Sequence, residues 1–176
     1  MQIRAATGED ADGIRGIYLS AFPDSESMVV AELAVDLLAE DSTPPTLSLL
    51  AESDGSMLGH VAFSPVSLES GADFHGYILA PLAVRPNDQK CGIGSQLVES
   101  GMRQLSERGV DVVFVYGDPE YYKRFGFGVE AARDYLPPYK LQHPFGWQAI
   151  FLREIDREEP REKITCVTSL RDPTLW

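Results

Sequence analysis

The sequence predicts an α+β domain, formed by residues 1–176 as one unit, with a mixed and mostly antiparallel sheet. Patterns typical of helices and of strands alternate along the chain, and Asp54-Gly55 between two strand patterns is a strong signal for an antiparallel hairpin. Two apolar runs, residues 77–84 and 111–116, are joined by one amphipathic helix, which predicts a parallel βαβ unit with a right-handed crossover. A chain of 176 residues is also long enough to bury about 70% of its unfolded surface in one core.

Composition and charge argue against several classes of function. The net charge of −12 argues against nucleic-acid binding, which needs a basic footprint. An acidic surface favours cationic partners such as amines, and an acidic surface that only maintains solubility is an equally good interpretation. No apolar run approaches the ~20 residues that span a bilayer, and Met1–Arg4 leads into an acidic segment, so we expect neither a membrane span nor a signal peptide. Cys91 and Cys166 form no metal-ligand pattern, so we expect no metal site, reduced thiols and a cytoplasmic protein.

The N-terminal quarter is predicted to form a short strand over residues 3–6 and then two helices. Thr7 and Asp10 form a capping box that opens the first helix. Its apolar positions follow at helical spacing: Ile14, Ile17, Tyr18 and Ala21. Pro23 ends this helix, and the second helix carries a clear apolar stripe: Val30, Leu33, Ala34, Leu37 and Leu38.

The central part of the chain is predicted to form three strands. Residues 46–52 and 57–68 flank the Asp54-Gly55 turn, and a third strand runs from about His75 to Val84. Pro81 lies inside this third strand, although proline cannot donate to a ladder. The position predicts either a bulge that exposes backbone groups or a plain edge strand, and we prefer the bulge because a candidate ligand site follows directly.

The remaining elements continue this alternation. A helix begins near Gly94 and ends at Arg108-Gly109, and a buried strand over 111–116 leads into a short helix over 120–125. Proline and aromatic residues then become frequent. In the last third we expect a strand over Trp147–Ile155, an exposed charged segment over 156–163 and a short strand over Thr165–Ser169.

The first candidate functional motif is Gln89-Lys90-Cys91-Gly92-Ile93-Gly94, at the start of the helix after the third strand. Gly92 and Gly94 allow a phosphate to approach the backbone, and the helix N-terminus supplies free N–H groups and a positive potential. Arg85, Lys90 and the Ser95 hydroxyl add donors nearby. The motif alone also fits a tight turn, and it matches neither the dinucleotide-binding nor the ATP-binding glycine pattern.

The second candidate motif is Tyr122-Lys-Arg-Phe-Gly126-Phe127, on the short helix after the next strand. Parallel strands bring their carboxyl ends to one edge, so we expect the Tyr122 phenol to project into the cleft between them, where it could donate a proton to a leaving group. A half-buried aromatic residue of the core is the alternative interpretation, and for a tyrosine taken alone it is the more common one.

Together the two motifs resemble the GNAT N-acetyltransferase superfamily. The family signature is a Leu-Ala-Val-type strand, then Arg/Gln-x-x-Gly-x-Gly/Ala at a helix start, then Tyr-x-x-x-Gly-Phe after the next strand. Here these are Leu82-Ala83-Val84, Gln89 to Gly94, and Tyr122 to Phe127, in that order. The resemblance is strong in the middle third of the chain, and residues 131–176 form the variable C-terminal part of the same expected domain.

The resemblance implies an α/β sandwich with helices on both faces, in which the fourth and fifth strands splay to admit the pantetheine arm. It also implies acetyl transfer from acetyl-CoA to a primary amine of a small molecule or peptide, by direct attack. Leu82, Ala83 and Val84 would bind the pantetheine and thioester, and Tyr122 would protonate the departing thiolate. The pyrophosphate would be bound by the loop and helix start: Gln89, Lys90, Cys91, Gly92, Ile93, Gly94 and Ser95. Lys90 stands where the family commonly has glycine, and Cys91 is a small loop residue and not a nucleophile.

The general base and the acceptor are not identified by the motifs. An alkylamine with a pKa near 10.4 costs about 4–5 kcal/mol to deprotonate at pH 7, and residues 77–84 contain no carboxylate. The candidates near strand ends are Glu69, Asp73, His75 and Asp118. The acceptor pocket is expected near residues 22–27, residues 69–73 and the C-terminal aromatics, which are equally compatible with a core or a homodimer contact: Tyr135, Tyr139, Phe145 and Trp147. A catalytically inactive acyl-CoA sensor or interaction module on the same fold is the alternative function.

Overall fold

The computed structural model describes residues 1–154 and 161–176. Contacts between residues divide the chain into two compact units. The first unit comprises Met1–Phe63 and Ala80–Gly101, and the second comprises Ser64–Leu79 and Met102–Trp176. Because the boundaries fall inside two strands and one helix, these elements contribute residues to both units.

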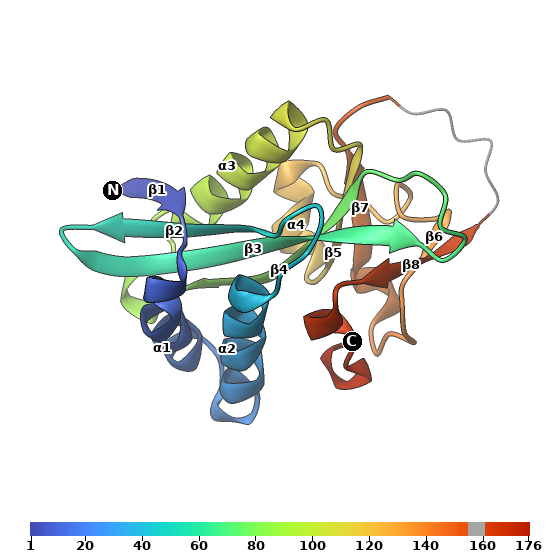
Figure 1. The fold of residues 1–176 in the computed structure, drawn as a ribbon. Helices are drawn as coiled ribbons and strands as arrows, with labels where there is room; N and C mark the ends of the chain where they lie inside the picture. Colours follow the sequence, from blue (N-terminus) through green and yellow to red (C-terminus); the bar gives the residue numbers. More distant parts are fainter. Residues whose placement is uncertain (155–160) are drawn as a thin grey trace. The chain divides into compact units, whose positions relative to one another are not determined.

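Figure 1 labels the helices and strands in chain order. The first half of the chain contains β1 (Gln2–Ala5), α1 (Ala11–Ala21), α2 (Asp24–Ala39), β2 (Leu47–Ser53), β3 (Ser56–Leu68) and β4 (Gly76–Val84). The second half contains α3 (Ile93–Glu107), β5 (Val112–Tyr116), α4 (Pro119–Tyr122), β6 (Tyr135–Leu136), β7 (Trp147–Phe151) and β8 (Glu162–Cys166). Short 3-10 turns connect several of these elements.

The first unit is built on an antiparallel meander. β1 pairs with β2 from Gln2↔Glu52 onward, and β2 pairs with β3 down to Ser53↔Ser56. Asp54 and Gly55 between them both have positive φ, at 50° and 76°, as a tight two-residue hairpin turn requires. The predicted hairpin is therefore confirmed.

Helices cover both faces of the strands in the first unit. The Tyr18 hydroxyl on α1 lies 2.9 Å from His60 Nδ1 on β3, which places α1 on one face. A Cβ at Gly59, the neighbouring residue, would lie 3.1 Å from Leu97 of α3. Because successive residues of a strand face opposite sides, α3 lies on the other face (Figure 1). The expected placement of helices on both faces is confirmed within this unit.

The core beneath α1 and α2 is formed by Ile14, Ile17, Tyr18, Ala31, Ala34, Leu50 and Ala83. Ile14, Ile17, Tyr18 and Ala34 are apolar positions that the helical periodicity predicts. One glycine of α1, Gly13, leaves room for a side chain of β3, and a second, Gly16, lies at ordinary contact distance from Arg85. A Cβ at Gly13 would overlap Met57, and one at Gly16 would lie 3.5 Å from the Arg85 guanidinium. The first helical turn carries the predicted capping interaction, in which the Asp10 carboxylate accepts from the Thr7 N–H at 2.8 Å.

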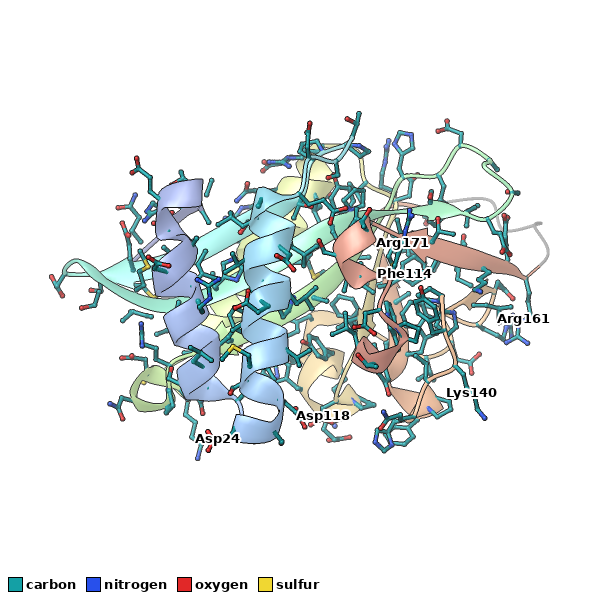
Figure 2. The ribbon with its side chains drawn as sticks, turned by 60° about the horizontal axis from the view of Figure 1, so that its bottom comes forward. Asp24, Phe114, Asp118, Lys140, Arg161 and Arg171 are labelled. Carbon is teal, nitrogen blue, oxygen red and sulfur yellow. The ribbon has the colours of Figure 1, made fainter. Side chains whose placement is uncertain are left out.

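The second unit contains the parallel strand pair. β4 and β5 are parallel from Gly76↔Val112 to Leu79↔Val115, as the βαβ pattern predicts, and β5 pairs antiparallel with β7. The end of β3 pairs with β8, which also pairs with β6. The core is rich in aromatic rings and contains the fully buried Phe114, which Figure 2 labels. The rings of Phe114 and Trp147 are stacked, with their centroids 5.3 Å apart.

Two sequence predictions need correction here. The last strand is β8, Glu162–Cys166, and residues 168–170 form a 3-10 turn in place of the expected strand over Thr165–Ser169. Pairing with the end of β3 places Ile164 and Cys166 in the core and leaves the polar positions outside, so tertiary pairing decides the register. The strand expected over Trp147–Ile155 ends at Phe151, and its last residue, like most of the charged segment, lies outside the described residues.

Two further expectations concern the membrane and Pro81. In the described part of the chain no helix has the length and apolarity of a membrane span. Pro81 lies inside β4 and follows a cis peptide bond from Ala80. The bulge at Pro81 and the splay of β4 from β5 stay predictions.

Candidate functional site

The backbone at the end of β4 has two distinct edges. The Ala83 carbonyl oxygen would lie 3.0 Å from a Cβ at Gly59, and Arg85 N–H donates to the Leu58 carbonyl at 2.8 Å, so both groups face β3. Since backbone groups alternate along a strand, those of Leu82 and Val84 face the other edge. Ala83 itself contributes its buried side chain to the core under α1 and α2.

The loop after β4 is tied back to that strand by two side chains. Gln89 Nε2 donates to the Val84 carbonyl at 3.0 Å. Arg85 Nε donates to the Met57 carbonyl at 2.7 Å, so its guanidinium is directed toward β3 and α1. The Gln89 side chain therefore links the loop to the end of β4 (the clasp between strand and loop), and the Arg85 side chain links the end of β4 to β3.

The turn between loop and helix uses two left-handed residues. Lys90 has φ 62° and Gly92 has φ 82°. Lys90 thus adopts the conformation that a glycine would adopt at lower cost, and the backbone geometry expected for a glycine is present despite the substitution. Cys91 lies between them, exposed and free, with its Sγ 3.5 Å from the Gln89 carbonyl.

The N-terminus of α3 follows immediately. Gln96 N–H donates to the Gly92 carbonyl at 3.0 Å, which is the first bond of the helix ladder. The N–H groups of Ile93, Gly94 and Ser95 precede that bond and have no acceptor within the helix. The first turn of α3 carries no acidic residue, so nothing there opposes an anion.

These observations describe an anion-binding geometry in the first unit. The structure brings together the candidate residues at the end of β4 and in the following loop and helix: Leu82, Ala83, Val84, Gln89, Lys90, Cys91, Gly92, Ile93, Gly94 and Ser95. Converging N–H groups at a helix N-terminus, with a lysine on the adjoining turn, are suited to a diphosphate.

Tyr122 belongs to the second unit and is the last residue of α4. This short helix begins at Pro119 and is capped by Asp118, whose carboxylate accepts from Glu120 N–H at 2.9 Å (Figure 2). A left-handed Gly126, φ 91°, ends the following 3-10 turn, and a Cβ there would lie 2.9 Å from Ile150. The spacing of Tyr122 and Gly126 therefore reflects a helix that must end at a glycine.

The Tyr122 side chain is half-buried among aromatic rings. Its ring makes edge contacts with Tyr121 at 5.0 Å and with Phe127 at 5.8 Å. Burial raises the pKa of Tyr122 well above its ordinary value of about 10, and the neighbouring Tyr121 and Asp118 act in the same direction. The raised pKa keeps the Tyr122 phenol protonated, and among the described residues its hydroxyl has no hydrogen-bond partner.

Two residues around Tyr122 were not singled out by the sequence. A Cβ at Gly117 would lie 2.6 Å from Tyr122 Cε2, so the ring lies directly on the Gly117 backbone. Gln148 on β7 is buried and donates to the Gly117 carbonyl at 3.2 Å. The signal available in the sequence was an amide side chain inside an apolar strand, Trp147–Phe151.

The four candidates for a general base lie in the second unit. Asp73 and His75 form an exposed pair at 3.4 Å. Glu69 is exposed just after β3, and the Asp118 carboxylate is used as the cap of α4. None of the four is a buried carboxylate.

The C-terminal aromatics divide into two groups. Trp147 is buried, and its Nε1 donates to the Tyr135 carbonyl at 2.9 Å, so both belong to the core of the second unit. The Tyr139 hydroxyl donates to the Arg171 carbonyl, whereas Phe145 is 64% exposed. Of the four, Phe145 is the one with a large apolar surface available to a ligand or partner.

Comparison with known proteins identifies a family. The family model described as the acetyltransferase (GNAT) domain matches residues 2–130. The chain is 37% identical over 142 residues to the uncharacterised N-acetyltransferase YjhQ of Escherichia coli (strain K12), covering 78% of this chain and 77% of that protein.

Two solved structures are also similar over nearly the whole chain. One is the GNAT family N-acetyltransferase YhbS of Escherichia coli in complex with CoA, with TM-score 0.79, 32% identity, and coverage of 93% of this chain and 87% of that one. The other is a GNAT family acetyltransferase of Brucella melitensis in complex with acetyl-CoA, with TM-score 0.71, 30% identity, and 96% coverage of both chains.

Proposed function

The chain belongs to the GNAT acetyltransferase family, and on that premise we propose that it transfers the acetyl group of acetyl-CoA to a primary amine of a small molecule or peptide by direct attack. The observation that carries the proposal is the start of α3, where a left-handed turn leads into consecutive backbone N–H groups and the first helical turn carries no acidic residue. Such a site recognises a diphosphate, which acetyl-CoA contains. Similar proteins with CoA and acetyl-CoA bound support the same donor.

The donor-binding residues divide into two groups by their proposed contacts. The N–H groups of Ile93, Gly94 and Ser95, with Lys90 beside them, bind the pyrophosphate. Leu82 and Val84 direct their backbone groups away from β3 and bind the pantetheine and thioester. The Val84 carbonyl already accepts from Gln89, so we assign the Val84 N–H and both Leu82 backbone groups to this contact. One of these N–H groups polarises the thioester carbonyl.

Tyr122 is the proposed general acid. As the amine attacks the thioester carbon, the C–S bond breaks and the sulfur leaves as a thiolate, which takes the Tyr122 proton. A raised pKa keeps this phenol protonated throughout the physiological range, and its hydroxyl proton is not committed to a described neighbour. Solvent then returns a proton to Tyr122.

The attacking amine must be neutral. At pH 7 this requirement costs about 4–5 kcal/mol for an alkylamine, and a nearby carboxylate stabilises the ammonium form while also being able to accept its proton. We propose that Asp118, Asp73, His75 or Glu69 receives this proton, directly or through water, because these groups are the candidates at the strand ends of the second unit.

A catalytically inactive acyl-CoA sensor is the second candidate function. The observation in its favour is that β4, Gly76–Val84, contains no carboxylate that would serve as base. On this alternative the same loop binds acetyl-CoA, and Tyr122 is only a packed aromatic residue.

The two functions are separated by titration and by turnover. Isothermal titration with acetyl-CoA, and with ATP as a comparison ligand, should show binding of acetyl-CoA and at least about tenfold weaker binding of ATP. Free thiol released from acetyl-CoA is then followed with a panel of primary amines that includes polyamines, aminoglycosides and peptides with free N-termini. Amine-dependent thiol release supports the transferase. Binding without release across the panel supports the sensor, and preferred binding of ATP contradicts both.

A further inference from the structure

Gln148 is a buried amide in a strand that is otherwise apolar. It lies in β7 opposite Val115 of β5, and only 1% of its surface is exposed. A buried amide without hydrogen bonds costs about 1–3 kcal/mol relative to an apolar residue, so its retention needs a partner. Its Nε2 donates to two main-chain carbonyls, Gly117 at 3.2 Å and Gly146 at 3.3 Å.

These two carbonyls belong to two turns that are in direct backbone contact. Gly117 N–H donates to the Gly146 carbonyl at 3.0 Å. A Cβ at Gly146 would lie only 3.0 Å from the Gly117 carbonyl oxygen, so neither turn tolerates a larger residue without moving. The Gln148 amide thus holds the carbonyl group of Gly117, the residue directly after β5, in place.

The Tyr122 ring lies on this fixed peptide. A Cβ at Gly117 would lie 2.6 Å from Cε2, 3.2 Å from Cδ2 and 3.6 Å from Cζ, the carbon that carries the hydroxyl. A shift of Gly117 therefore moves the phenol directly. The ring also contacts the rings of Tyr121, Phe127 and Phe125, which as side chains can adjust more readily than the backbone.

We propose that Gln148 is a positioning residue for Tyr122, acting through the Gly117 backbone on which the phenol lies. The proposal rests on the proposed function, in which Tyr122 is the general acid. Gln148 does not take part in proton transfer. It holds the hydroxyl where the leaving sulfur departs, and a displacement of even about 1 Å at such a position can cost up to 10²-fold in rate.

The test is a double-mutant cycle with an added spectroscopic measurement. Gln148→Met keeps the length and burial of the side chain and removes its N–H donors, and Gln142→Met on the exposed neighbouring segment is the matched control. Turnover is measured as thiol release with the best amine of the panel, in the wild type, Gln148→Met, Tyr122→Phe and the double variant. The ring carbon of Tyr122 is followed by NMR in protein labelled at the tyrosine ζ carbon, with Tyr122→Phe giving the assignment.

We expect Gln148→Met to lower kcat about tenfold, to leave acetyl-CoA affinity within about twofold, and to cost nothing further in the Tyr122→Phe background. We also expect the Tyr122 resonance to shift and its titration to begin at a lower pH, because a loosened ring is better solvated. Gln142→Met should change none of these. If Gln148→Met does not fold, Gln148→Asn, which keeps an amide that is too short to reach both carbonyls, is measured in the same way.

The outcomes separate this inference from the proposed function. An unchanged Tyr122 resonance in a folded Gln148 variant, or a full additional loss of kcat in the Tyr122→Phe background, overturns the positioning role. If Tyr122→Phe itself leaves turnover unchanged while the resonance still moves with Gln148, the acid assignment fails and the structural coupling of Gln148 to Tyr122 stands.

Discussion

The proposed general-acid role of Tyr122 depends separately on the identity of the residue and on its environment in the fold. The residue's identity and its distance from Gly126 are in the sequence, and the general-acid role followed only when this motif and the glycine motif together resembled the family. The raised pKa and the uncommitted hydroxyl depend on the rings and the backbone that surround it in the fold. Gly117 and Gln148 contribute to that environment from after β5 and from β7, and no local spacing connects them.

His60 is the second residue whose pKa is determined mainly by burial. It is fully buried on β3 between two hydroxyl groups, with Tyr18 at 2.9 Å from Nδ1 and Ser48 at 2.7 Å from Nε2. Burial lowers the pKa of His60 to about 3. A neutral imidazole satisfies both neighbours because one ring nitrogen donates and the other accepts.

This burial predicts acid sensitivity. The unfolded chain binds a proton at His60 below pH about 6.5 while the folded chain does not, so the free energy of unfolding decreases as the pH falls from about 6.5 toward 3. Urea denaturation at pH 7 and pH 4.5 should show that the wild type loses about 2–3 kcal/mol more over this interval than His60→Gln. Equal losses in the two proteins would mean that His60 does not supply this dependence.

The element that carries the donor half of the proposed reaction is the segment from β4 to α3. Its glycine spacing predicted a phosphate-binding turn; the positive φ of Gly92 shows a left-handed turn there, and phosphate binding stays a prediction. The side-chain contacts of the segment were not predictable in the same way. Gln89 and Arg85 both have donors that suit a phosphate, and in the structure both donate to main-chain carbonyls of strands.

Lys90 allows a test of the turn. Its φ of 62° costs a non-glycine residue about 1–2 kcal/mol, so Lys90→Gly should leave the free energy of unfolding unchanged or raise it by up to about 1 kcal/mol. Lys90→Val should lower it by about 1–2 kcal/mol, because a β-branched residue is least tolerant of this conformation. The matched control is Lys140→Gly, at an exposed loop position without a positive φ, where glycine should be neutral or destabilising. Destabilisation by Lys90→Gly equal to that of the control would contradict the left-handed turn.

Gln89 allows a test of the clasp between strand and loop. Gln89→Leu removes the bond to the Val84 carbonyl and should weaken acetyl-CoA binding about three- to tenfold, the effect of one hydrogen bond of about 1 kcal/mol. Gln96→Leu, one turn into α3 and exposed, should leave the affinity within about twofold, since it keeps the backbone N–H that donates to the Gly92 carbonyl. Calorimetric titration of both variants measures this difference. If Gln89→Leu and Gln96→Leu bind acetyl-CoA with equal affinity, the hydrogen bond from Gln89 to Val84 does not organise the loop for binding.

Regular elements were predictable where local chemistry decides them. The capping residues of the first helix, the Asp54-Gly55 hairpin and the apolar stripes of the helices are local signals, and each appears in the structure. The last strand was predicted too late in the chain, because β8 begins with the polar residues Glu162 and Lys163, which do not give a strand pattern. Pairing with the end of β3 and with β6 stabilises this strand. A sequence pattern does not contain that partner.

At the scale of the whole chain, the mixed sheet with parallel β4 and β5 and the membership of the GNAT family both agree with what the sequence predicted. The acceptor did not follow from the sequence, because a net charge of −12 favours amines in general and selects none of them. The proposed donor-binding residues belong to the first unit, and the proposed general acid, Tyr122, belongs to the second.

The central claim is that Tyr122 supplies the proton to the departing thiolate, and the steady-state turnover of Tyr122→Phe tests it most directly. Phenylalanine keeps the ring on Gly117 and removes the hydroxyl, so acetyl-CoA should bind with unchanged affinity while kcat falls about 10²-fold or more. Because burial raises the pKa of Tyr122, the wild-type rate should also show no loss attributable to its ionisation up to about pH 10. A Tyr122→Phe variant that binds acetyl-CoA and turns over at the wild-type kcat would contradict the account.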